Sequence, residues 1–160
     1  MKTVRIALPA TALLAFAAAG SATAQEQTVG YEVQAVSEIS FSGSPSLVIG
    51  QATAGTGLTS ASAGASYALT TNQSGMKITA QLGAALPDHV VLSVSLEAPS
   101  GGTSAGTVAL SDAVAKDVVT GVSTVNESGL DVTYTLAAGV AAGVVPAGTV
   151  QVMYTVTAAL

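Results

Sequence analysis

The stretch VGYEVQAVSEISF, residues 29–41, alternates apolar and polar side chains along its length. This period of two is typical of a β-strand that buries one face, and we therefore predict a long amphipathic strand over residues 28–41. The predicted apolar face, which is also the candidate self-assembly face, consists of Val29, Tyr31, Val33, Ala35, Ile39 and Phe41.

The same alternation recurs through the rest of the chain, without any long helical period. Further predicted strands cover residues 47–49, 67–71, 76–82, 90–97, 107–110, 118–122, 130–136 and 150–156. We expect a turn at residues 72–75 to join two of them as a hairpin, with Gly75 supplying a positive φ. The pattern predicts an all-β fold, a single immunoglobulin-like β-sandwich of about eight or nine mostly antiparallel strands.

Three segments between the predicted strands have a biased or turn-like composition. Residues 50–66 are almost entirely small or hydroxyl-bearing, which predicts a long surface loop. Residues 137–148 are uncharged and predict a loop or a short buried edge. Ser111 and Asp112 are predicted to cap one helical turn that ends at Asp117.

The beginning of the chain has the three-part layout of a secretory signal peptide. Lys2 and Arg5 precede an apolar run, and Ala22 and Ala24 supply the small residues that a signal peptidase reads before Gln25. The alternative, a membrane anchor, is disfavoured because the run is shorter than the roughly 20 residues needed to span a bilayer. We predict a signal peptide at 1–24, a β-sandwich domain at 25–160, and an exported protein without a membrane span in its mature chain. The extracellular space, the cell surface and the periplasm all remain open as destinations.

The chain has few charged residues, and its net charge is negative. Charged residues make up only 8% of the sequence, with 4 Lys plus Arg against 9 Asp plus Glu. Cleavage before Gln25 would leave Lys77 and Lys116 as the remaining cations. Nucleic acid is therefore an unsuitable partner, because a basic surface is needed to bind phosphates. The absence of cysteine also excludes disulfides and thiolate metal sites.

Motifs for catalysis and metal binding are weak. Residues 102–106, GTSAG, match the G-x-S-x-G pattern, but they lie in a Gly/Ser-rich stretch without the strand-to-helix context of a nucleophile elbow. A triad built on Ser104 would need His89, the single histidine, which lies in a predicted turn. Asp112 and Asp117 could supply oxygen ligands to a cation, or they could be a cap and a solvated carboxylate. We expect no catalytic residue, no metal and no cofactor.

The C-terminal strand includes Tyr154, Thr155, Val156 and Thr157, a V-x-Y-T-V-T-like ending. With this ending, its lack of cysteine and its small-residue composition, the chain resembles the secreted bacterial β-sandwich subunits of surface fibres and pili over most of residues 25–160. The resemblance is compositional, and it implies a structural protein whose residues 28–41 complete the sheet of a neighbouring copy. Its partners would be further copies of itself or other cell-surface components.

Other readings of the sequence remain open. Residues 28–41 could pair within their own domain instead of with a neighbour. The protein could also be a monomeric binding module for carbohydrate or another small ligand, using the loops at residues 50–66 and 99–106. A hydrolase is the third alternative.

Overall fold

The computed structural model describes residues 24–159 of the 160-residue chain. Ala24 and Gln25 are the first described residues, whereas Ala22 and the rest of the predicted signal peptide lie outside the described residues. Backbone contacts separate the residues up to Glu32 from a unit that begins at Val33. Residues 24–36 contain no strand, and every strand of the described chain belongs to the second unit, called the β domain below.

The β domain is built from antiparallel strands, and the described residues contain no α-helix. One 3₁₀ turn, η1, covers Val140–Ala142. The strands in chain order are β1 (Ser37–Ser42), β2 (Ala52–Thr53), β3 (Gly57–Leu58), β4 (Ala61–Thr71), β5 (Met76–Leu82), β6 (Val90–Leu96), β7 (Thr103–Ser104), β8 (Val108–Ala109), β9 (Lys116–Val122), β10 (Val125–Ala138) and β11 (Val152–Ala158).

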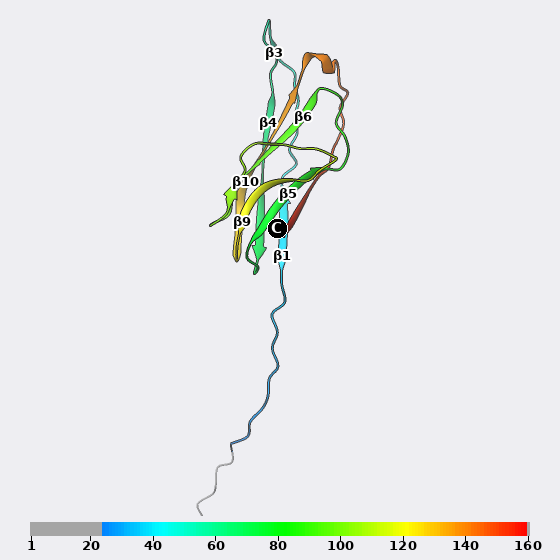
Figure 1. The fold of residues 1–160 in the computed structure, drawn as a ribbon. Helices are drawn as coiled ribbons and strands as arrows, with labels where there is room; N and C mark the ends of the chain where they lie inside the picture. The colour runs from blue at the N-terminus through cyan, green and yellow to red at the C-terminus, as the bar shows by residue number, and fades with distance from the viewer. Residues whose placement is uncertain (1–23, 160) are drawn as a thin grey trace, which may run out of the picture. The chain divides into compact units, whose positions relative to one another are not determined.

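Two sheets make up most of the β domain (Figure 1). The five-stranded sheet has the order β1-β4-β10-β6-β8, and the four-stranded sheet has the order β11-β5-β9-β7. Strands β2 and β3 form a separate small hairpin. Strands β1 and β11 are each an outer strand of their sheet, as β8 and β7 are at the opposite edges, and β1 and β11 contact each other along one side of the domain.

Apolar residues from both sheets share a single core. The alternation predicted from the sequence is found in β6, where Leu92, Val94 and Leu96 are buried and the serines between them are only partly covered. Both sheets supply fully buried side chains to the same cluster, because each turns its apolar face toward the other. The largest of these side chains are Tyr67, Leu69, Ile78, Val94, Leu96, Val118, Val119, Val122 and Val132.

The turn at residues 72–75 differs from the predicted hairpin in one respect. The turn is present and Gly75 has a φ of 67°, as expected. However, β4 and β5 do not pair; they belong to different sheets, so the chain crosses the core at this point. The connection between β9 and β10 crosses at the same end, and the Thr124 amide donates to the Gln73 carbonyl at 2.9 Å. The hairpin prediction was wrong because spacing along the chain does not reveal which strands become neighbours.

Three other local predictions are also wrong. Residues 47–49 form no strand, although Leu47 packs against the core. Residues 112–114 form bends in place of a helical turn and β9 begins at Lys116, and the Ser111 hydroxyl accepts the Ala113 amide at 3.1 Å. The predicted loop at residues 50–66 contains β2, β3 and the first half of β4. That half of β4 is strand because it pairs with residues 131–136 of β10, a long-range contact that its small-residue composition does not reveal.

Candidate assembly surface

The predicted assembly strand is divided between two environments. Ile39 and Phe41 lie in β1, where they pair with Leu69 and Tyr67 of β4 in the same copy. Val29, Tyr31, Val33 and Ala35 precede β1 and belong to no strand. The side chains of Val29, Tyr31 and Val33 are 75%, 96% and 85% exposed. Val29, Tyr31 and Val33 are therefore alternate apolar residues that lie outside any strand and are largely exposed.

Asn72 explains why β1 begins at Ser37 and not at Thr28. Strand β4 ends at Thr71, opposite Ser37, and the chain then turns toward β5. The Asn72 side chain takes the place of the missing strand: its Oδ1 accepts the Val36 amide at 2.8 Å, and its Nδ2 donates to the Gln34 carbonyl at 2.7 Å. The backbone amide of Asn72 also donates to the Val36 carbonyl at 3.2 Å. Because β4 ends at Thr71, it has no further backbone with which the residues before Ser37 could pair to lengthen β1.

Aromatic rings hold the outer strands β1 and β11 together. The rings of Phe41 and Tyr154 stack with centroids 4.1 Å apart, and Phe41 also stacks on Tyr67 at 5.7 Å. The Tyr154 hydroxyl donates to the Tyr134 hydroxyl at 2.8 Å. The Tyr67 hydroxyl donates to the Glu97 carbonyl. These four rings link both sheets where their outer strands meet.

The core is incompletely covered along this side. Ile78 and Val94, on interior strands, are fully buried. In contrast, Ile39 of β1 and the core-facing residues of β11 are only partly buried, and Phe41 is 37% exposed. We name this strip the apolar seam, and it consists of Ile39, Phe41, Val152, Tyr154 and Val156. An outer strand has a neighbour on one side only, so its inward side chains lack the cover that a further strand would provide.

Burial changes the acid–base properties of two of these tyrosines. Burial raises the pKa of the Tyr67 hydroxyl well above its ordinary value, and the nearby carboxylates of Glu97 and Glu127 add to the rise. Burial also raises the pKa of the Tyr154 hydroxyl, and its hydrogen bond with Tyr134 contributes further. Both hydroxyls are therefore neutral donors over the whole physiological range of pH.

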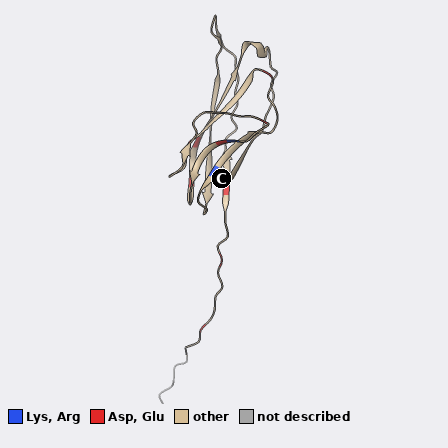
Figure 2. Cartoon of the chain, in the orientation of Figure 1, with Lys and Arg blue, Asp and Glu red and all other residues tan. Residues whose placement is uncertain are grey.

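The outer face of the five-stranded sheet is covered by hydroxyl groups in place of ion pairs. Ser42 and Ser66 form a cross-strand hydrogen bond of 2.7 Å between β1 and β4, and Ser62 and Thr135 form one of 3.1 Å between β4 and β10. Figure 2 shows how few charged residues lie along the chain of the domain. With so few charges along its edges, the domain lacks a common device that keeps strand edges of neighbouring molecules apart.

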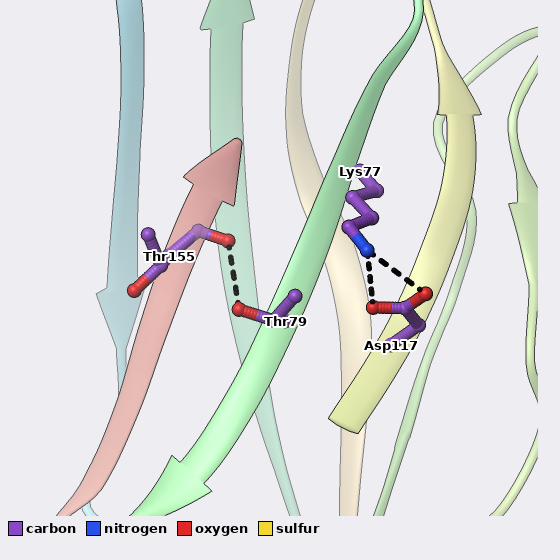
Figure 3. Close-up of polar contacts among 4 residues, drawn as sticks. All are labelled: Lys77, Thr79, Asp117 and Thr155. Atoms are coloured by element: carbon purple, nitrogen blue, oxygen red, sulfur yellow. Dashed lines mark hydrogen bonds and ion pairs between the residues drawn. The ribbon is translucent and has the colours of Figure 1, made fainter. Parts of the chain in front are cut away.

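The one ion pair found among the described residues involves a residue of the candidate cation site. Lys77 of β5 contacts Asp117 of β9, with its Nζ 3.1 Å from Oδ1 (Figure 3). On the other side of β5, the Thr79 hydroxyl donates to the Thr155 carbonyl of β11 at 3.5 Å. Asp117 thus has a cationic neighbour, and the Asp112 carbonyl accepts the Gln81 side-chain amide. Within residues 24–159, no three His, Asp or Glu side chains are grouped as a metal site would require.

The G-x-S-x-G match lies in an extended context. Ser104 is in the two-residue strand β7, where its hydroxyl donates to the Leu96 carbonyl and its oxygen accepts the Gly106 amide at 3.1 Å. His89 occupies the turn before β6 with a φ of 65°, and its carbonyl accepts the Gly139 amide. Ser104 therefore lies in a short strand and not in the strand-to-helix turn of a nucleophile elbow.

A shallow depression of the β domain is relevant to the alternative of a small-molecule site. A depression of about 210 Å³ lies beside β1 and β4, and it is lined by four serines together with Phe41, Tyr67, Ala68 and Gly129. Ligand pockets usually measure about 300–1,000 Å³. The loops at residues 50–66 and 99–106 contain no aromatic residue on which a sugar ring could stack.

Comparisons of the chain with protein-family models, with curated proteins and with solved structures find no match. Within the part of the chain that the structure describes, no helix has the length and apolar character needed to cross a membrane.

Proposed function

We propose that this protein is a secreted, non-enzymatic structural subunit of the cell surface or extracellular matrix, which assembles by β-strand addition. The observation that carries the proposal is the exposure of Val29, Tyr31 and Val33 at 75%, 96% and 85% in a segment without secondary structure. Their alternate spacing allows all three side chains to enter one groove when the segment becomes a strand. Residues 29–35 are the donor segment of this proposal.

The apolar seam of a second copy is the acceptor. Val152, Tyr154 and Val156 of β11 have the same two-residue spacing as Val29, Tyr31 and Val33. A donor strand beside β11 would gain main-chain hydrogen bonds at an outer edge and would cover partly exposed apolar side chains. Residues 29–35 and strand β11 together contain one charged residue, Glu32, so little charge has to be buried at this contact.

We also propose that the domain is an immunoglobulin-like sandwich in its architecture. The shared core between two antiparallel sheets supports this description. For comparison, the letters A to G are given in chain order to its seven longer strands, which are β1, β4, β5, β6, β9, β10 and β11. In these letters the two sheets have the orders A-B-F-D and G-C-E. Immunoglobulin domains have A-B-E-D and C-F-G, so the likeness extends to the layers and not to the strand order.

The assembly proposal is tested with the chain from Gln25 onward, with Tyr31→Asp and Val33→Asp variants beside the wild type. Size-exclusion chromatography with light scattering and negative-stain microscopy should show concentration-dependent oligomers of the wild type that both variants lose. Thr28→Asp is the matched control, because it adds the same charge just before the donor segment, in the register of its opposite face, and should leave assembly intact. A wild-type protein that is monomeric at every concentration, or variants that assemble as well as it does, would overturn the proposal.

A further inference from the structure

The loop that follows β10 is a strongly apolar, exposed part of the β domain. Residues 137–148 contain no charged residue. Val140, Val144 and Val145 of this stretch are 74%, 98% and 40% exposed. We name these three residues the apolar loop. Val91 is exposed beside it, since β6 pairs its residue Val91 with Ala137 of β10.

Strand register places the apolar loop and the start of β1 at opposite ends of the β domain. Leu136, just before the loop, pairs with Ala61 at the beginning of β4. Ser37, at the start of β1, pairs with Thr71 at the end of β4. The turn at residues 72–75, which crosses from β4 to β5 and is called the crossing turn below, also lies at this second end. Figure 1 shows the two ends of β4 far apart, at opposite ends of the domain. Val33 and Val36 are exposed just before β1.

The direction of β11 determines where a neighbouring copy would lie. Strand β11 runs from Val152, opposite Leu82, to Ala158, opposite Met76, so its C-terminal end lies beside the crossing turn. A donor segment that pairs antiparallel with β11 runs the opposite way and leaves the seam beside Val152. Antiparallel pairs are the commoner kind and need no crossover. The neighbour's β1 then begins beyond the end of the domain that carries the apolar loop.

We infer that the apolar loop of one copy receives the crossing-turn end of the next copy, around Val33 and Val36. This inference rests on the strand addition proposed above and specifies its partner surface. The contact joins opposite ends of the domain, so it is heterologous, and such contacts repeat as an open filament unless the rotation between copies closes a ring. The inferred assembly is a head-to-tail filament in which every internal copy buries its apolar loop.

The absence of cysteine makes the contact testable by site-specific cross-linking in the chain from Gln25 onward. Val144→Cys labels the apolar loop, and Ser74→Cys labels the exposed crossing turn. The two single variants are mixed, disassembled and reassembled, and then oxidised mildly. The expected product is a disulfide-linked dimer between Val144→Cys and Ser74→Cys. Each variant alone should give far less cross-linked dimer. Thr133→Cys, on the exposed outer face of the five-stranded sheet, is the control and should cross-link poorly to either.

The outcomes separate this inference from the function on which it rests. Assembly in which Val144→Cys and Ser74→Cys cross-link no better than the Thr133→Cys control would overturn the head-to-tail contact and leave strand addition standing. A wild-type protein that never assembles would overturn both. A Val144→Asp variant should form shorter filaments, while the donor segment of one copy still binds its neighbour. Binding of the donor segment is measured as protection of residues 29–35 from proteolysis in small oligomers. Filaments of unchanged length would contradict the inference.

Discussion

The ring of Phe41 stacks on the ring of Tyr154 with centroids 4.1 Å apart, joining β1, an outer strand of one sheet, to β11, an outer strand of the other. The two residues are far apart in sequence and belong to strands that do not pair. Their contact closes the apolar seam at its middle while leaving Phe41 partly exposed. The seam is therefore both a stabilising contact of the domain and the surface where we place a donor strand.

Phe41→Ala should destabilise the domain by about 2 kcal/mol, less than the roughly 3–5 kcal/mol typical of a fully buried phenylalanine. The cost is reduced because part of the Phe41 ring already contacts solvent. Urea unfolding followed by circular dichroism measures the change. Val48→Ala, at an exposed site, is the control and should change stability little. Equal effects of the two substitutions would show that the aromatic stack does not hold the outer strands.

Tyr154→Phe should lower the free energy of unfolding by about 1 kcal/mol. The substitution keeps the stack on Phe41 and removes the hydroxyl that donates to Tyr134. Tyr31→Phe, in the exposed donor segment, is the matched control and should leave the stability of the monomer unchanged. If Tyr154→Phe is as stable as the wild type, the tyrosine pair is a packing contact only.

Alkaline pH should unfold the domain. The pKa values of Tyr67 and Tyr154 are raised in the folded protein, so above the ordinary tyrosine pKa of about 10 the unfolded chain loses protons that the folded chain retains. Stability from these two groups is fully present below that pH and falls as pH rises beyond it. Absorbance of tyrosinate at alkaline pH, followed together with circular dichroism, should show two of the tyrosines ionising only as the fold is lost. Ionisation of all tyrosines before unfolding would contradict the prediction.

Asn72→Ala should release the residues before β1 without unfolding the domain. The substitution removes the side-chain bonds to the Val36 amide and the Gln34 carbonyl, at a cost of about 1–2 kcal/mol. Hydrogen exchange should become faster at the Val36 amide while β5 and β10 stay protected. Asn126→Ala removes a single bond from Thr70 and should leave Val36 unchanged. Unaltered exchange at Val36 in Asn72→Ala would show that another contact orders this segment.

Export should remove residues 1–24. When the full chain is produced in a bacterial host, mass spectrometry of the exported protein should give Gln25 as its first residue. Ala24→Phe should block cleavage and retain the longer form, because the peptidase accepts only small residues at that position. Cleavage at another site, or an uncleaved wild type, would contradict the prediction.

The amount of structure that could be predicted from sequence varies between elements for identifiable reasons. Strands β5 and β6 match the predicted ranges closely, because their alternation is strong and is set by which face each side chain occupies. The N-terminal half of β4 was missed because Ala61, Ala63 and Gly64 give little apolar contrast, and only pairing with β10 makes them strand. The alternation of residues 29–41 was visible in the sequence, but its division at Ser37, between a segment outside any strand and β1, was not.

The order of residues by itself determined the strand periodicity, the turn at Gly75, the scarcity of charge and the alternate apolar side chains of the donor segment. All of these are local, because they depend on neighbours within a few positions of the chain. Tertiary structure alone decided that β4 and β5 join different sheets, that Asn72 ends the pairing of β1, and that Phe41 meets Tyr154. Those relationships depend on which distant strands pack together, which follows from burying the whole apolar surface at once and not from any single segment.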